Sequence, residues 1–419
     1  MPSGLGDFSP NHVPGELLAF VEQTGQAEPA GLAQAETNAG VRRLGSLGQG
    51  WLHYRAAPGN ELAAAKALLA KGMVKFVQPN YIYKPLFTPN DPLYATNQAQ
   101  QLNGAMRLQA AWDIEKGQSC PPYIAVLDTG ITLNHEDFAG VLYLPTGANL
   151  DVVGATASNP TPDTDPSHNG ADGHGTRVTG VLGAATNNLK GIAGTTMGGR
   201  IIPIKVYGDD NTGTSATIAS GIDLAISLKA RVINISSCLA DASGCLDTTD
   251  PFMESKIKTA HDQGRVVVAS AGNDNNSFVG YPASSVYAIA AGAINSSTLA
   301  RSTFSNYGSA LDLVAPGGDC VTAACLTATE YVTTTDTSGG YGDVIGTSFS
   351  SPFVAGTVAL FMSKYGKTFG QWPSWQRVYS CLTSTAEDLG PLGFDNEYGY
   401  GLVRIDLALN NSSSCMVYP

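Results

Sequence analysis

The chain has 419 residues, more than one compact core usually holds, so a large domain joined to a smaller one is expected. Hydrophobic residues make up 43% and charged residues 14% of the chain, which excludes an intrinsically disordered protein and a coiled coil. The formal net charge of -12 predicts that neither a nucleic acid nor a membrane is a partner.

Cysteine usage bears on the compartment. The amino terminus lacks the charged and apolar regions of a signal peptide, and no apolar run is long enough to span a bilayer. The cysteines could form three short-range disulfides, Cys238 with Cys245, Cys320 with Cys325, and Cys381 with Cys415, with Cys120 left over. The alternative is a set of unpaired buried thiols. We favour an oxidising compartment, and expect a secreted protein whose signal peptide is absent from this chain.

The first part of the chain has the pattern of a small α+β domain. Between residues 16 and 84, strand-like and helical stretches follow the order strand, helix, strands, helix, strand, which is that of a ferredoxin-like sandwich. Its second helix is expected to follow Asn60 and to stop at Gly72. We predict a tail over residues 1–14 and a domain over 15–86. The prolines and polar residues of LFTPNDPLYATNQ predict a linker after it.

From Tyr123 the pattern changes to short apolar runs separated by helical segments. The predicted strands are YIAVLD, RIIPIKVY, VINIS and RVVVASAGN, and the helices between them include ATIASGIDLAISLKA and PFMESKIKTAHDQG. This alternation predicts an α/β domain with a doubly wound, mainly parallel sheet and helices on both faces. We expect it over residues 87–411, followed by a tail over 412–419 that Cys415 could tie down. Functional residues in such sheets lie at the carboxyl ends of strands.

The stretch GTSFSSPFVAG places Ser348 before an apolar run that predicts a buried helix to about Lys364. A serine here is a good helix N-cap, because its hydroxyl can accept a hydrogen bond from an unpaired backbone N–H. Pro352 is tolerated in a first helical turn. Taken alone, the motif leaves a helix cap and a nucleophile as alternatives.

Three other polar residues lie at strand ends or at a helix start, where the functional sites of parallel sheets are found. Asp128 ends an apolar strand, His174 opens a helical stretch, and Asn273 follows another strand. Asp128 alone could be a turn former and His174 an exposed helix start. Acyl transfer by serine needs an imidazole base and a carboxylate to orient it, and the chain order Asp, His, Ser is one known arrangement. The amide of Asn273 could then donate to the oxyanion beside the backbone N–H of Ser348.

The segments VLDTGI, GHGT, ASAGN and GTSFSSP around these residues resemble those of subtilisin-like serine proteases, nearest to the thermitase-type secreted members. The resemblance implies a serine endopeptidase made as a proenzyme, with Ser348 as nucleophile, His174 as base, Asp128 as its orienting carboxylate and Asn273 as oxyanion donor. The amino-terminal unit resembles the inhibitory propeptide of that family. The implied partners are protein or peptide substrates and the chain's own propeptide, processed between residues 84 and 89. A monomer without an organic cofactor is expected.

The resemblance also implies where substrate binds. An extended substrate would add as a strand and be held mainly by its backbone. The edges offered to it are Thr212, Gly213 and Thr214 on one side and Ser236, Ser237, Cys238 and Leu239 on the other. The second edge departs from the usual Ser-Leu-Gly-Gly, and a bridge from Cys238 to Cys245 would brace it. Gly280 matches the floor of the pocket for the residue before the scissile bond, where a large apolar or aromatic group is expected. The alternative is a glycine that serves only the following turn.

A calcium site is implied in the same way. The corresponding residues are Asp91, Asp137, Thr186, Asn188, Lys190 and Ile192, and hard oxygen ligands from side chains and loop carbonyls suit Ca²⁺. The alternative is an asparagine-rich turn with no ion. His135 and His168 lie nearby in the sequence, but their spacing is not that of a zinc site.

We therefore expect a broad-specificity endopeptidase. Two alternatives remain at this point: a narrow maturation protease that cuts one precursor, and a binding protein in which the two domains form a permanent non-catalytic pair.

Overall fold

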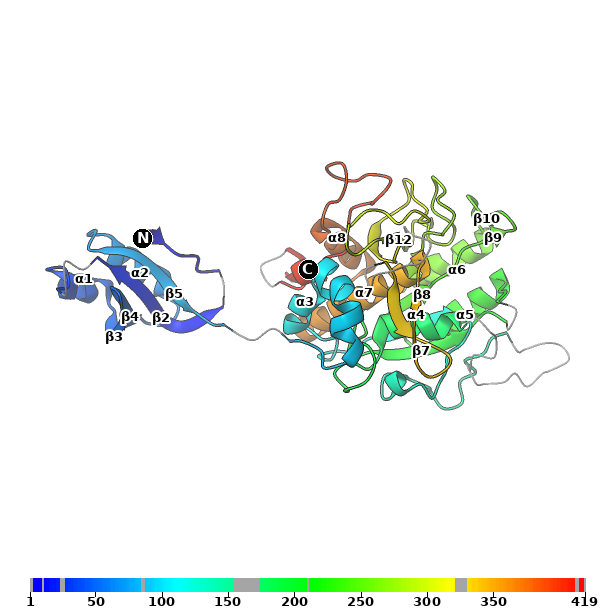
Figure 1. Cartoon of the computed structure of the whole chain (residues 1–419), viewed down its shortest axis with the longest axis horizontal. Coiled ribbons are helices and arrows are strands. Elements are labelled where there is room, and N and C mark those ends of the chain that lie inside the picture. Colours follow the sequence, from blue (N-terminus) through cyan, green and yellow to red (C-terminus); the bar gives the residue numbers. More distant parts are fainter. Residues whose placement is uncertain are drawn as a thin grey trace. The chain divides into compact units, whose positions relative to one another are not determined.

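The computed structural model describes residues 3–9, 11–22, 27–83, 87–153, 173–208, 211–320, 330–410 and 414–417. The chain divides into two compact units, Met1–Pro85 and Leu86–Pro419 (Figure 1). Each unit has a hydrophobic core of its own. In the described parts of the chain, no helix combines the length and the apolarity that a membrane span requires.

The first unit is a sheet with two helices against its apolar face. Its elements are β1 (Gly4–Leu5), β2 (His12–Val21), α1 (Leu32–Ala39), β3 (Arg42–Gly48), β4 (Trp51–Arg55), α2 (Glu61–Leu69) and β5 (Val74–Tyr81), in the strand order β1-β5-β2-β4-β3. Leu17, Ala19 and Val21 alternate along β2 and are fully buried, as a sheet with one covered face requires. The predicted ferredoxin-like sandwich is confirmed.

The expected amino-terminal tail partly joins this sheet. β1 pairs in parallel with β5, the backbone N–H of Gly6 donates to the carbonyl of Val77 (2.7 Å), and β2 begins at His12. Helix α2 ends at Leu69, three residues before the glycine expected to stop it. The small residues of the tail carry no apolar pattern, so their pairing could not be seen in the sequence.

The second unit is built on six parallel strands. These are β6 (Tyr123–Asp128), β7 (Arg200–Lys205), β8 (Val232–Ile235), β11 (Val266–Ser270), β12 (Ala288–Ile294) and β13 (Leu313–Pro316), in the order β13-β12-β11-β8-β6-β7. Nearly all of their residues are buried, which agrees with continuous apolar runs covered on both faces. The predicted α/β fold with a mainly parallel sheet is confirmed.

Helices cover the sheet and connect its strands. They are α3 (Leu108–Ile114), α4 (His174–Gly183), α5 (Ser215–Ser227), α6 (Pro251–Asp262), α7 (Thr347–Phe369), α8 (Trp375–Thr385) and α9 (Ile405–Ala408), with short 3-10 turns at Glu136–Phe138 and Ser414–Met416. Helix α7 packs on the central strands and against α4, whereas α5 and α6 pack against each other. Two short hairpins complete the unit, β9 (Ala240–Asp241) with β10 (Gly244–Cys245) and β14 (Val332–Thr335) with β15 (Tyr341–Val344).

The segment predicted to be a linker is part of the second unit. Tyr94 and Gln98 are buried in a π-helical turn, and the N–H of Leu93 donates to the carbonyl of Gly191 (2.8 Å). The ring of Phe87 packs edge-on against Trp112 at 6.0 Å. Prolines and polar residues suggested a linker, but the aromatic residues among them find partners far along the chain.

Candidate active site

The carboxylate and the imidazole meet where β6 ends and α4 begins. Asp128 is the last residue of β6 and His174 the first of α4, and His174 Nδ1 lies 2.8 Å from Asp128 Oδ1. Asp128 is 2% exposed, and the N–H of Thr129 donates to the same oxygen. A Cβ on Gly175 would lie 2.3 Å from the carbonyl oxygen of Gly130, so only glycine lets the start of α4 approach β6 this closely.

The hydrogen bond to Asp128 defines the chemistry of the imidazole. When Nδ1 donates to a carboxylate, the neutral ring carries its lone pair on Nε2, where it can accept a proton. The His174 ring lies 5.8 Å from the ring of Phe349, so it packs beside the first turn of α7. That turn also carries Ser348.

Ser348 is the second residue of α7 and is not its cap. The helix begins at Thr347 with Gly346 as N-cap, and the Ser348 hydroxyl donates to the backbone carbonyl of Ser236 (3.2 Å). The cap interpretation is therefore wrong. The helix also runs past Lys364 to Phe369, where a glycine with φ 69° ends it.

Pro352 ties the nucleophile candidate to a neighbouring strand end. It is the sixth residue of α7, beyond the first turn, and has no N–H to donate to the carbonyl of Ser348 four residues earlier. The hydroxyl of Ser236, which follows β8, donates to that carbonyl instead (2.9 Å) and also contacts Ser351 Oγ (2.8 Å). The carbonyl of Ser348, which has no partner within the helix, is thus hydrogen-bonded to Ser236 of the second predicted substrate edge.

Asn273 has its side-chain amide fixed by the residue before Ser348. Asn273 Oδ1 accepts from both the backbone N–H and the hydroxyl of Thr347, each at 2.8 Å. The amide oxygen therefore faces α7, and Nδ2 lies 3.5 Å from where a Cβ on Gly346 would stand. The orienting role of Thr347 was missed in the sequence, where its only signal is its place in the GTS motif.

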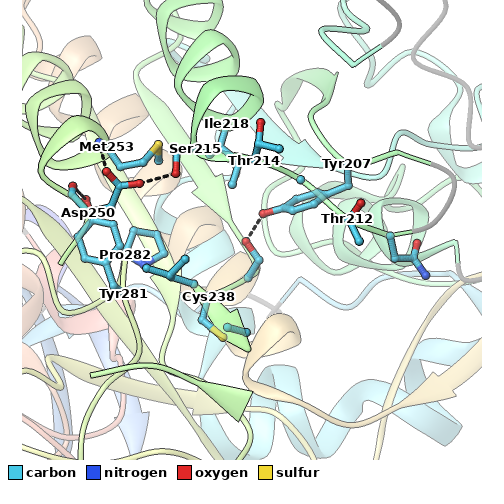
Figure 2. A pocket seen from close by; sticks show the side chains of 15 residues that line it. Tyr207, Thr212, Thr214, Ser215, Ile218, Cys238, Asp250, Met253, Tyr281 and Pro282 are labelled. Atoms are coloured by element: carbon cyan, nitrogen blue, oxygen red, sulfur yellow. Dashed lines mark hydrogen bonds between the residues drawn. The ribbon is translucent and has the colours of Figure 1, made fainter. Parts of the chain in front are cut away.

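The two predicted substrate edges border one cavity. It has a volume of about 310 Å³ and is lined by all three residues of the first edge and by Ser237, Cys238 and Leu239 of the second, together with Tyr207, Asn211, Ser215, Ile218, Ala240, Asp250, Met253, Tyr281 and Pro282. The Tyr207 hydroxyl is hydrogen-bonded to the Ser237 hydroxyl. Figure 2 shows Tyr207 among the side chains that line this cavity. Tyr207 also lines a cavity of about 180 Å³ that includes His174 and Asp128. The sequence pattern indicated only a strand at Tyr207, and no place in the site.

The expected open space in front of Gly280 is not found. The predicted bridge between Cys238 and Cys245 is confirmed, and it stands against this glycine. A Cβ on Gly280 would lie 2.9 Å from Cys245 Cβ and 3.1 Å from Cys238 Cβ. The sequence predicted Gly280 as a pocket floor and the bridge as the brace of a loop. That the bridge packs directly against Gly280 depends on the fold and could not be predicted from the sequence.

The other cysteines differ from expectation. Cys320 is disulfide-bonded, but its predicted partner Cys325 lies outside the described residues. Cys381 and Cys415 lie in contact as thiols and do not form the predicted bridge. The hydrogen bond with Cys415, together with burial, raises the pKa of Cys381 and keeps the thiol protonated. Cys120 is a free thiol.

The predicted calcium ligands converge on one loop. Asp137 is fully buried, and its carboxylate accepts from Asn188 Nδ2 (2.8 Å) and from the N–H of Ile192 (3.0 Å). Asp91 is 3% exposed and accepts from the N–H groups of Asn187 (2.8 Å) and Asn188 (3.3 Å). Burial, with a contribution from the charge of Asp137, raises the pKa of Asp91. Two buried carboxylates supply the hard oxygen ligands that a divalent cation such as Ca²⁺ prefers.

The remaining predicted ligands turn their side chains elsewhere. Thr186 Oγ1 donates to the carbonyl of Ala184 (3.1 Å), and the Lys190 ammonium pairs with Glu136 (3.1 Å). They could contribute only backbone carbonyls. Within the described ranges, no three or more His, Cys, Asp or Glu side chains form a metal-binding group. His135 Nε2 contacts the carbonyl of Gly340 (2.7 Å), and His168 lies outside the described residues.

Comparisons with known proteins identify the class to which this fold belongs. A model of the subtilase family matches residues 121–401. The chain is 36% identical over 341 residues to a thermophilic serine proteinase of Bacillus sp. (strain AK1), covering 81% of this chain and 74% of that protein. It is 32% identical over 309 residues to thermitase of Thermoactinomyces vulgaris, covering 73% of this chain and 94% of thermitase.

Among solved structures, the fold is similar to one described as proteases from Pseudoalteromonas arctica PAMC 21717, with a TM-score of 0.64 and 28% sequence identity. The matched region covers 78% of this chain and 100% of that chain. The chain therefore belongs to the subtilase family and is a thermitase-type serine endopeptidase.

Proposed function

We propose that the chain is a secreted proenzyme whose larger unit hydrolyses peptide bonds through Ser348, His174 and Asp128. The observation that carries the proposal is the 2.8 Å hydrogen bond between His174 Nδ1 and Asp128, beside the turn that bears Ser348. Ser348 Oγ attacks the scissile carbonyl carbon while His174 Nε2 takes the hydroxyl proton. Asp128 stabilises the imidazolium, which then protonates the leaving amine. Water, activated by the same imidazole, hydrolyses the acyl-enzyme.

The hydroxyl of Ser348 must turn for this reaction. It donates to the Ser236 carbonyl in the free protein, and it turns towards His174 when substrate binds. The negative oxygen of the tetrahedral intermediate receives hydrogen bonds from Asn273 Nδ2 and from the backbone N–H of Ser348. Two bonds from Thr347 hold the Asn273 amide before substrate arrives, so little reorganisation is needed during the reaction.

Substrates are extended protein segments held between the two edges. The apolar cavity of Figure 2 takes a side chain upstream of the scissile bond, because Ile218, Met253 and Tyr281 line it. Broad specificity is proposed because an added strand is held mainly through its backbone, which every sequence offers. A large apolar group does not bind at Gly280, because the bridge fills that space.

The amino-terminal unit acts as the inhibitor of the larger one. Its last strand β5 leads to Ile82 and Tyr83, which are 44% and 90% exposed. Apolar residues exposed at the end of a folded unit suit a segment that binds in the substrate edges like a product. Cleavage between residues 84 and 89 then releases the mature enzyme. Secretion agrees with the bridge of Cys238 to Cys245, since disulfides persist in oxidising compartments.

A structural Ca²⁺ ion would be held by Asp91, Asp137 and Asn188 with carbonyls of residues 186, 190 and 192. Bound there, the ion neutralises two buried carboxylates and fixes the loop after α4. It takes no part in the chemistry at Ser348.

Ser348→Ala tests the proposal. We expect a folded protein, with an unchanged thermal unfolding midpoint, that no longer cleaves casein. A panel of unrelated unfolded proteins should be cut by the processed wild type. Cleavage of only one partner precursor would indicate a narrow maturation protease, and casein cleavage by the alanine variant at the wild-type rate would refute the role of Ser348.

A further inference from the structure

The positions of Ser348 and Asn273 determine where the residue before the scissile bond must bind. Its carbonyl carbon meets Ser348 Oγ and its carbonyl oxygen meets Asn273 Nδ2, so its Cα lies one bond away, about 1.5 Å from that carbon. The strands β8 and β11 are neighbours in the sheet, so the segments that follow them, residues 236–239 and 271–274, start side by side at this point. We infer that the side chain enters between these two segments, which we call the two walls.

Cys245 occupies the space between these walls. It comes from hairpin β9–β10 and is covalently joined to Cys238 on the first wall. On the second wall, a Cβ on Gly272 would lie 2.8 Å from Cys245 Sγ and 2.4 Å from Asn306 Nδ2. Gly280 lies next to the second wall, because its N–H donates to the carbonyl of Ala271 (2.8 Å). A Cβ on Gly280 would lie 2.9 Å from Cys245 Cβ. The bridge therefore packs against both glycines and fills the space that a large substrate side chain would need.

The loop that carries Cys245 is held in place from both sides. The N–H of Cys245 donates to Asp274 Oδ2 (2.8 Å), and a Cβ on Gly244 would lie 2.3 Å from Asp274 Oδ1. The N–H of Leu246 donates to the carbonyl of Leu239 (2.9 Å) and closes the loop. Cys245 is only 7% exposed. A substrate side chain cannot displace a group that is bonded covalently to one wall and hydrogen-bonded to the other.

We propose that the bridge between Cys238 and Cys245 is the specificity determinant of this site and restricts the residue before the scissile bond to glycine, alanine or serine. The proposal rests on the peptidase function proposed above. Cys238 also lines the cavity of Figure 2, so one side of the bridge faces that cavity. Large apolar side chains of the substrate bind on the cavity side of the bridge.

Peptide p-nitroanilides that differ only in their last residue, alanine, leucine or phenylalanine, test the inference. For the processed wild type we expect kcat/KM to be at least about tenfold higher for alanine than for phenylalanine, since filling even one or two methylenes of a pocket discriminates by about that much. For Cys238→Gly with Cys245→Gly, the ratio of phenylalanine to alanine should rise at least about tenfold. A wild type that prefers phenylalanine, or a ratio that this variant leaves unchanged, would overturn the proposal.

A matched variant separates the volume of the bridge from its covalent bond. Cys238→Ser with Cys245→Ser keeps side chains of similar size and removes the cross-link. Because the loop of Cys245 is then held only by hydrogen bonds, we expect the preference for alanine over phenylalanine to weaken and the unfolding midpoint to fall. A preference as strong as that of the wild type, in a variant whose unfolding midpoint has fallen, would show that the covalent bridge is not the determinant and would overturn the proposal.

A third measurement requires no variant. Mass spectrometry of a denatured protein digested by the wild type should show small residues before most cleavage sites. Failure of this inference is distinguishable from failure of the peptidase function. A wild type that reacts with a serine-directed fluorophosphonate and cuts after aromatic residues contradicts only the inference, whereas one that neither reacts nor cuts contradicts the function.

Discussion

Replacing Thr347 by valine removes one hydroxyl at nearly constant side-chain volume. That hydroxyl donates to Asn273 Oδ1 (2.8 Å) and accepts from the N–H of Gly272 (3.2 Å). The backbone N–H of Thr347 also donates to Asn273 Oδ1 and is unaffected by the substitution. The variant therefore keeps one of two bonds that orient the oxyanion donor, and it leaves a buried N–H at Gly272 without this partner.

The size of both effects follows from these contacts. One neutral hydrogen bond contributes about 0.5–1.5 kcal/mol, so kcat should fall about 2- to 12-fold with KM nearly unchanged. Removing the donor itself, by Asn273→Ala, should lower kcat about 100- to 1000-fold. The unpaired N–H of Gly272 should lower the free energy of unfolding of the valine variant by about 1–3 kcal/mol.

Steady-state kinetics with a peptide p-nitroanilide, together with chemical unfolding, measure these effects. Thr347→Ser is the control, because it keeps the hydroxyl and loses only a methyl group, and its kcat should stay near that of the wild type. An unchanged kcat in the valine variant, or an equal loss in the serine variant, would refute the orienting role of Thr347.

Three further predictions concern stability and the approach of α4 to β6. Chelation of calcium should lower the unfolding midpoint of the wild type, and Asp137→Asn should remove this response; equal shifts in both proteins would contradict the proposed ion site. Burial raises the pKa of Asp312 to about 6. The Asp312 carboxyl therefore binds its proton more tightly in the folded protein than in the unfolded chain, and it makes the free energy of unfolding fall as the pH rises from about 4 to about 6. Asp312→Asn removes this titration, so the free energy of unfolding of the variant should depend less on pH over that range than that of the wild type. Gly175→Ala should lower both kcat and the unfolding midpoint, because its Cβ would meet the Gly130 carbonyl at 2.3 Å; a fully active and stable variant would show that α4 can move away at no cost.

Local patterns predicted the framework of the fold well. The run YIAVLD coincides with β6, and α4 begins at His174, because a buried parallel strand and the start of a helix are both defined by neighbouring residues. The same patterns indicated the residue types of the site. They could not give its distances, since these depend on how β6, β8 and α7 pack.

The errors of the sequence analysis arise from contacts between distant residues. The motif around Ser348 left a helix cap as an alternative to the predicted nucleophile, because the partner of its hydroxyl, the carbonyl of Ser236, lies 112 residues away. Tyr94 looked like part of a linker because its burial depends on the second unit's core. Gly280 looked like an open floor because the sequence does not show that Cys245 folds back against it.

The central claim is that Ser348 is made nucleophilic by His174. Peptide mapping of a fluorophosphonate adduct, on wild type and on His174→Ala, tests it most directly. We expect one adduct, on Ser348, in the processed wild type and a labelling rate at least about a thousandfold lower in the variant. An adduct on another residue, or equal labelling without the imidazole, would contradict the account.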